Sequence, residues 1–194
     1  MKRQLTFSQY RNVDLVLFAV ILAVFESVIA MAATRWFPGQ LYTVSASAAV
    51  CAIVLMRWGA WAGIHAVLGG LVFCTVCGGS AAQFLIYGIG NLGCLIAVLI
   101  LKWAGSGRIR QDKLYSILFA LAVQLLMQLG RALVALLLGT EPARCVGFIT
   151  TDTLSGLFTM VIIYIVRQLD GVFENQKDYL VRLQAEQRKE KGGF

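Results

Sequence analysis

The run LLMQLGRALVALLLGT (residues 125–140) is almost wholly apolar, yet it contains one arginine, Arg131, near its middle. A charged side chain near the centre of a bilayer costs roughly 2.5–3.5 kcal/mol on insertion scales, so such groups usually face a partner or a cavity. A guanidinium can pair with a carboxylate of the protein, or it can bind a carboxylate or phosphate of a ligand. Arg131 is therefore the first candidate for a binding residue.

Two acidic residues fall at a depth similar to that of Arg131. Glu26 lies beyond the middle of the first apolar segment, and Asp152 lies near the start of the last one. With a rise of about 1.5 Å per helical residue, both carboxylates are expected in the same half of the membrane as Arg131. Either one is a candidate partner for the guanidinium, and either one is a candidate contact for a ligand.

Further polar side chains are spaced so that they share helix faces with these groups. Gln83, Tyr87 and Asn91 follow one another at intervals of four residues, which places them on one face of a helix. Gln128 shares a face with Arg131 by the same rule. Together the positions predict a polar pocket that opens on the outer side of the membrane.

Aromatic residues of the first outer loop complete the predicted pocket. Trp36, Phe37 and Tyr42 flank its opening in the sequence and are expected to line it. The alternative is that Arg131 forms a structural ion pair that only ties helices together.

The elements that position these residues are expected to be transmembrane helices. The chain of 194 residues is 59% hydrophobic and 14% charged, and its mean hydropathy is +0.76. Soluble domains are about 45–50% apolar and about 25% charged. Six apolar stretches approach the length that a hydrocarbon core requires. They are residues 14–34, 41–56, 59–77, 81–103, 114–139 and 147–167.

The distribution of basic residues predicts the orientation. All but three of the 17 Lys and Arg residues fall on one side of the apolar segments; Arg35 and Arg144 lie on the other, and Arg131 lies within a segment. Cytoplasmic loops carry this excess, so both termini are expected in the cytoplasm of a multi-pass plasma-membrane protein. The same distribution explains the net charge of +7 without a nucleic-acid partner.

The sequence thus predicts an all-α, six-helix transmembrane bundle in three parts. Residues 1–13 form a cytoplasmic N-terminus, residues 14–167 the membrane domain, and residues 168–194 a cytoplasmic tail. Apolar residues recur in the tail at near-helical spacing, which predicts an amphipathic helix. That helix either extends the last span into solvent or lies on lipid or on a partner.

Motifs typical of enzymes or metal sites are not expected to operate here. Cys74-x-x-Cys77 has no second pair and no cluster of histidines beside it, so packing is the preferred interpretation and no metal site is predicted. His65, the single histidine, is expected to be packed and hydrogen-bonded. The glycines of GIGNLG (88–93) lie within a helix and favour close helix packing over nucleotide binding. The sequence has no Gly-x-Ser-x-Gly elbow and no His-Glu-x-x-His pair, so the chain is not predicted to be an enzyme, and it has no P-loop, so it is not predicted to use ATP by itself.

Small residues form a stripe on the first helix. Ala19 and Ala23 stand four residues apart in the half of the helix away from the predicted pocket. Such pairs give a flat surface on which another helix can pack. A pocket at one end and a smooth surface at the other suit a protein that binds a solute and docks on a partner.

These features resemble the substrate-binding S-components of energy-coupling-factor (ECF) transporters. The outline is six spans in about 190 residues, both ends inside, and the Ala19-x-x-x-Ala23 motif. The most similar stretch is FPGQLYTVSASAAVCAIVLMRWGAWAGIHAVLGGL (37–71), with a proline-containing loop, a Ser- and Ala-rich helix, a short turn and a glycine-rich helix. The resemblance covers nearly all of the membrane domain.

The resemblance implies a function and partners. S-components bind a vitamin or related micronutrient in an outward pocket capped by the first outer loop, here Trp36 to Tyr42. They dock through the alanine motif, here Ala19 and Ala23, on a transmembrane coupling subunit that carries two ATPase subunits. ATP is then used by the partners and not by this chain. The alternatives are a stand-alone small transporter, an intramembrane enzyme that uses Glu26 or Asp152, or an assembly protein without a ligand.

Overall fold

The chain folds into helices throughout the part that the structure describes. The computed structural model describes residues 6–38 and 43–192, with side chains up to residue 186, and all regular secondary structure in this part is helical. The α-helices are α1 (Phe7–Trp36), α2 (Ser47–Trp58), α3 (Ala62–Val76), α4 (Ala81–Gly90), α5 (Ala97–Ala104), α6 (Ser106–Gln111), α7 (Lys113–Leu137), α8 (Pro142–Cys145), α9 (Gly147–Thr150), α10 (Thr153–Val166) and α11 (Gln176–Gly192). The 3-10 helices are η1 (Gly59–Trp61) and η2 (Asn91–Ile96). The predicted all-α class is confirmed.

Five helical stretches are long and apolar enough to cross a membrane, which is compatible with a multi-pass membrane protein. They are Phe7–Trp36, Ser47–Val76, Ala81–Ala104, Lys113–Leu137 and Pro142–Val166. Their outward faces are apolar as well. On α1, for example, Val16, Val20 and Val24 are each more than half exposed. A helix that exposes apolar side chains in this way is suited to lipid and not to water.

The second of these stretches is a helical hairpin. Gly59 lies between α2 and α3 with φ +60°, a conformation that glycine adopts without the steric cost of a Cβ. The chain reverses there, so that Ser47 packs on Gly69 and the Cys51 thiol approaches the Ala62 carbonyl at 4.0 Å. Helix α2 has 12 residues and is about 18 Å long. It begins later than the predicted segment 41–56, because Thr43 to Ala46 are not helical. The number of membrane crossings therefore stays a prediction.

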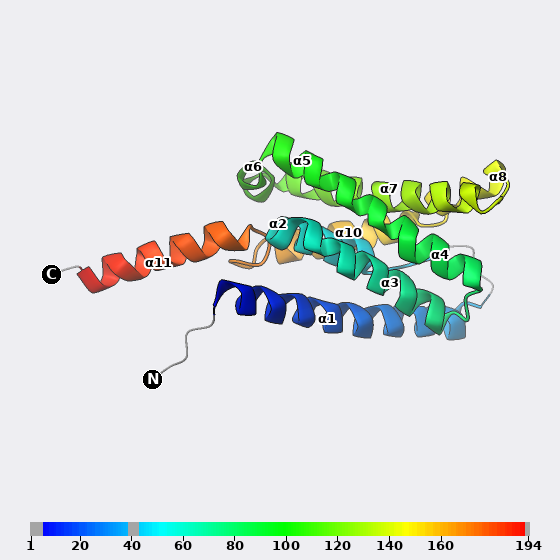
Figure 1. The fold of residues 1–194 in the computed structure, drawn as a ribbon, viewed down its shortest axis with the longest axis horizontal. Coiled ribbons are helices and arrows are strands. Elements are labelled where there is room, and N and C mark those ends of the chain that lie inside the picture. Colours follow the sequence, from blue (N-terminus) through cyan, green and yellow to red (C-terminus); the bar gives the residue numbers. More distant parts are fainter. Residues whose placement is uncertain (1–5, 39–42, 193–194) are drawn as a thin grey trace.

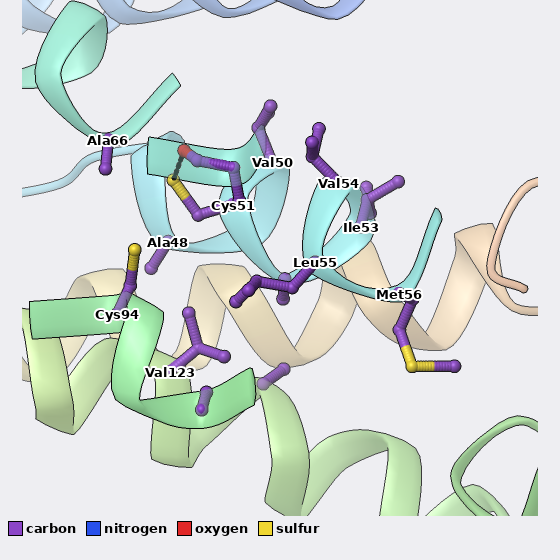
Figure 2. Packing of buried hydrophobic residues seen from close by; sticks show 14 of the residues in the cluster. Ala48, Val50, Cys51, Ile53, Val54, Leu55, Met56, Ala66, Cys94 and Val123 are labelled. Atoms are coloured by element: carbon purple, nitrogen blue, oxygen red, sulfur yellow. Dashed lines mark hydrogen bonds between the residues drawn. The ribbon is translucent and has the colours of Figure 1, made fainter. Parts of the chain in front are cut away.

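Helix α2 forms the centre of the bundle. All of its residues are buried, and apolar side chains of α3, η2 and α7 surround it. Figure 2 shows Cys51, Val54 and Leu55 of α2 above Cys94 of η2 and Val123 of α7. Because the other long helices shield α2 on every side, its sequence SAAVCAIVLM is apolar without the period of an amphipathic helix.

The two ends of the bundle differ. At one end lie the start of α1, the turn between α2 and α3, helix α6 and the long helix α11 (Figure 1). We call this the α11 end. At the other, which we call the distal end, α1 finishes, α4 begins and α8 lies. The segments that carry most of the basic residues meet at the α11 end, as the orientation argument requires. Which side of the membrane that end faces stays a prediction.

Glycines bring α4 and η2 against α7. A Cβ on Gly130 would overlap the carbonyl oxygen of Gly90, and a Cβ on Gly93 would overlap that of Leu126. A Cβ on Gly90 would lie 2.6 Å from the Cα of Arg131. The two backbones therefore touch without intervening side chains. The interpretation of GIGNLG as a helix-packing motif is confirmed.

Replacing Gly130 with leucine is expected to destabilise the protein, because the new side chain would enter space occupied by the Gly90 backbone. Overpacking of this kind typically costs about 1–3 kcal/mol, which for a protein of this size lowers the unfolding temperature by roughly 5 °C. Thermal unfolding of the purified protein in detergent measures the effect. Gly107→Leu is the matched control, because a Cβ there meets nothing within 4 Å. Equal unfolding temperatures for the two variants would contradict the close packing.

A second charged cluster lies at the α11 end, and we call it the basal clamp. The Arg57 guanidinium donates to both carboxylate oxygens of Asp14, at 2.8 and 2.7 Å, and to the carbonyls of Gly171 and Val172 at 2.5 and 3.0 Å. The Trp58 indole N–H donates to the same carboxylate at 2.5 Å. The clamp ties α1 and α2 to the chain that follows α10.

The structure corrects the predicted tail. Residues 168–175 are not helical; they form a compact turn in which Val172 and Phe173 join the core. Glu174 forms an ion pair with Arg110 at 2.6 Å and accepts a hydrogen bond from Arg182 at 2.9 Å. Helix α11 starts only at Gln176, whose side chain accepts from the Tyr10 hydroxyl at 3.0 Å. The near-helical spacing was misleading here because Val172 and Phe173 pack on the bundle from a turn, while Leu169 is exposed. An amphipathic face of α11 stays a prediction.

Candidate functional site

Arg131 lies in the bundle interior with two hydrogen-bond partners. Its Nε donates to Oδ1 of Asn91 at 2.6 Å, and its Nη1 donates to Oδ2 of Asp152 at 3.0 Å. Its guanidinium carbon lies 4.7 Å from the ring centre of Tyr87, so the aromatic face covers one side of the cation. Of the two carboxylates proposed as partners from the sequence, Asp152 forms the ion pair and Glu26 does not.

Asp152 gathers donors from three segments. It immediately precedes α10, but its side chain does not cap that helix. It turns instead to accept from the Thr43 hydroxyl at 3.1 Å, from the Ser155 hydroxyl, and from the Gln128 amide at 3.4 Å. The Gln124 amide donates to its backbone carbonyl at 2.9 Å. A buried carboxylate needs such partners, since leaving it unpaired is costly.

Asn91 is held so that its carbonyl oxygen faces Arg131. Its amide nitrogen donates to the Ala66 carbonyl of α3 at 3.0 Å, which leaves Oδ1 for the guanidinium. The glycine contact between α4 and α7 brings the two backbones close enough for this hydrogen bond. Tyr87, one turn earlier, packs against Phe73 with 5.0 Å between the centres of the two tilted rings.

Glu26 reaches the same region from α1. Its side chain is 1% exposed, and its Oε2 accepts the backbone N–H of Ala46 at 2.9 Å, at the start of α2. The neighbouring Ser45 N–H donates to the Ser155 hydroxyl at 3.0 Å. The non-helical segment 43–46 therefore runs between the two carboxylates and contacts both.

These groups surround a small cavity, which we call the inner cavity. Its volume is about 10 Å³, which is close to the space that one water molecule needs. It is lined by Glu26, Thr43, Ser45, Ser47, Gly69, Gly70, Phe73, Tyr87, Asn91, Arg131 and Asp152. Polar side chains thus meet at one point inside an otherwise apolar bundle. They come from α1, the segment before α2, α4 with η2, α7 and the start of α10.

A larger hollow adjoins the inner cavity toward the distal end, and we call it the outer groove. Its volume is about 250 Å³. It is lined by Ala30, Ala33, Thr34, Phe37, Pro38, Thr43, Val44, Phe73 and Cys77. Thr43 and Phe73 line both spaces, so the two are neighbours. Among the described residues that line the groove, none has a side chain with a full charge.

Some of the predicted pocket residues lie elsewhere. Gln83 is exposed and caps α4, because its side chain accepts from the Ser80 N–H at 2.7 Å while the Ser80 hydroxyl accepts from the Gln83 N–H. Trp36 is 75% exposed and lines neither hollow. Phe37 lines the outer groove only. Tyr42 lies outside the described residues.

Several lining residues were not predicted. Thr43, Ser45 and Ser47 contribute hydroxyls, and Gly69 and Gly70 let α3 approach. The signal was present in the sequence TVSAS (43–47), where small polar residues directly precede the apolar helix. Non-helical backbone at membrane depth is tolerated where it lines a cavity, so a polar run directly before an apolar helix indicates a cavity at that point.

The remaining residues that the sequence singled out lie outside the lining of the inner cavity. Ala19 and Ala23 of α1 are half-buried at the border between its core face and its outer face. His65 is fully buried and its Nε2 bonds the Leu15 carbonyl at 2.9 Å, so the prediction of a packed, hydrogen-bonded histidine is confirmed. Cys74 is buried and Cys77 is exposed at the end of α3.

The fold is an all-α bundle with a buried polar cluster and five helical stretches that are long and apolar enough to cross a membrane, which is compatible with the class of multi-pass membrane proteins. No protein-family model, no curated protein and no solved structure matches the chain.

Proposed function

We propose that the chain is a membrane receptor for a small solute, and specifically the substrate-binding S-component of an ECF-type importer. In this function it captures a vitamin or related micronutrient in a pocket that faces outward. A separate coupling subunit with two ATPases then drives delivery to the cytoplasm. The chain itself performs no reaction and holds no cofactor.

The observation that carries the proposal is the convergence of polar groups around the inner cavity. Glu26, Arg131 and Asp152 come from three separate parts of the chain and meet beside a groove that leads toward the distal end. A structural ion pair would need only two of them. The third group, together with the adjoining hollow, favours a binding site over a device that only holds helices together.

Further elements of the proposal rest on the sequence. The apolar segments predict six membrane crossings. The basic residues predict cytoplasmic termini and a distal end that faces outward. The docking role of Ala19 and Ala23 follows from the resemblance. Both side chains are half-exposed, so another helix has access to them.

Native mass spectrometry of the protein purified from its producing cells tests the receptor function. A receptor that binds its solute tightly is expected to carry a co-purified small molecule, which disappears from the spectrum of Arg131→Leu or Glu26→Gln variants that remain folded. An enzyme would instead convert the added solute, and product analysis after incubation detects this. Absence of any bound molecule after incubation with a vitamin mixture contradicts the proposal.

Solute uptake into cells distinguishes the S-component from a stand-alone transporter. The S-component is expected to support uptake only when a coupling subunit and its ATPases are produced in the same cells. Ala19→Leu with Ala23→Leu is expected to abolish uptake while binding is retained, because the larger side chains obstruct docking. Uptake without an ATPase would favour the stand-alone transporter.

A further inference from the structure

The charges around the inner cavity do not balance. Among the residues that line it, Glu26 and Asp152 are acidic and Arg131 is the one basic residue. Arg131 is already paired with Asp152 at 3.0 Å. One negative charge, that of Glu26, therefore remains without a basic partner among the described residues.

Glu26 is surrounded only by neutral donors among the described residues. Its Oε2 accepts from the Ala46 N–H, and the Ser45 and Ser47 hydroxyls are the other donors beside the carboxylate. A carboxylate that is 1% exposed and has only neutral partners is costly to bury, and a cation or charged N–H group placed in the cavity would offset that cost.

Arg131 presents a donor on the other side of the same cavity. Its Nε and Nη1 are bonded to Asn91 and Asp152, whereas its Nη2 has no acceptor among the described residues. Since Asp152 already neutralises its charge, Nη2 is suited to a neutral acceptor such as a carbonyl or ring nitrogen. An anionic ligand would instead meet two carboxylates against one guanidinium, which disfavours it.

The described lining of the outer groove adds no charged side chain to those that would select the ligand. Its lining side chains are apolar, apart from the hydroxyls of Thr34 and Thr43 and the thiol of Cys77. Phe37 and Phe73 supply aromatic surface on which a flat ring can pack. A volume of about 250 Å³ accommodates a molecule of one or two rings.

We propose that the solute is a small molecule with an aromatic or apolar body and a cationic or N–H-donating nitrogen, and that it is not an anion. The body lies in the outer groove, and the nitrogen enters the inner cavity to meet the carboxylate of Glu26. A neutral acceptor beside that nitrogen meets Nη2 of Arg131. This inference rests on the proposed receptor function and narrows it to one class of ligand.

Three probes with the same ring and different head groups test the proposal: benzylamine, benzyl alcohol and benzoate. Binding to the purified full-length protein in nanodiscs is measured by saturation-transfer NMR and by thermal shift. Benzylamine is expected to bind at least about tenfold more tightly than benzoate, as a charge-assisted hydrogen bond provides. Benzyl alcohol is expected to fall between them.

Variants show which carboxylate causes the preference for benzylamine. Glu26→Gln retains an acceptor for the Ala46 N–H, so α2 stays capped, and it is expected to weaken benzylamine binding about tenfold while benzyl alcohol binding is unchanged. Glu141→Gln is the matched control, because that carboxylate is 69% exposed on α8's N-terminal side and is expected to have no effect.

The outcomes separate the two proposals. Preferential binding of benzoate, or a Glu26→Gln variant with unchanged benzylamine affinity, overturns the charge preference but leaves a receptor. Failure of all three probes to bind the folded protein overturns the charge preference, whereas the receptor function is overturned only if native mass spectrometry also finds no bound molecule after incubation with the vitamin mixture.

Discussion

Replacing Arg57 with leucine is expected to lower the unfolding temperature of the purified protein by about 10 °C. The side chain is 6% exposed, and its loss would leave the Asp14 carboxylate, 8% exposed, without its basic partner. Breaking a buried pair from one side typically costs about 3–5 kcal/mol. Four hydrogen bonds in the basal clamp are lost at the same time, two of them to the Gly171 and Val172 carbonyls. Thermal unfolding in detergent measures the change.

Companion variants show whether the basal clamp is the cause. Arg57→Lys keeps the charge but not the planar fork, so it is expected to recover only part of the stability. Asp14→Asn added to Arg57→Leu removes the unpaired charge and is also expected to recover part. Arg144→Leu is the control, because Arg144 is 80% exposed and 3.8 Å from Glu141. A loss of stability in Arg144→Leu as large as in Arg57→Leu would refute the argument.

Replacing Arg131 with leucine is expected to have an effect of similar size, about 3–5 kcal/mol. The guanidinium is buried, and its removal would leave Asp152 with only neutral donors and Asn91 Oδ1 without its donor. Asp152→Asn in the same chain is expected to restore much of the stability, since the uncompensated charge is removed. Unfolding temperatures of the two single variants and the double variant give the coupling between the residues.

Binding separates the two functions of Arg131. The stabilised double variant Arg131→Leu/Asp152→Asn is expected to fold but to bind the solute at least about tenfold more weakly, because the Nη2 donor is lost. Full binding by that variant would show that Arg131 only holds the helices together, which is the structural alternative considered from the sequence.

The cluster around Arg131 was largely accessible from the sequence. Charged and amide groups in an apolar chain are few, and helix rise fixes their depth, so Glu26, Asn91 and Asp152 could be expected near Arg131. The choice of Asp152 as the ion-pair partner could not, because depth alone says nothing about rotation of the helices. The contact between the Gly90 and Gly130 backbones makes that choice by setting how α7 faces η2.

Errors arose where local signals competed with the depth argument. Gln83 shares a face with Tyr87, but it is also the fourth residue of Ser80-x-x-Gln83, a capping box that holds it at the helix start. The sequence argument assigned Arg57 to a cytoplasmic loop. The apolar runs beside Arg57 and the isolated Asp14 near the start of α1 were equally compatible with a buried ion pair. Tertiary packing determines which charged residues pair at the ends of the apolar helices, and the spacing of residues in the sequence does not show that packing.

The glycine contact between α4 with η2 and α7 has a mechanical consequence. Backbones that touch directly have no side-chain layer that could rearrange, so the two helices behave as a single rigid wall of the binding site. Helix α1 meets the bundle through side chains, and side chains can change rotamer. Any part of a solute that is larger than one water molecule can therefore enter the inner cavity only if the wall formed by α1 and the segment before α2 yields, while the wall that carries Arg131 stays in place.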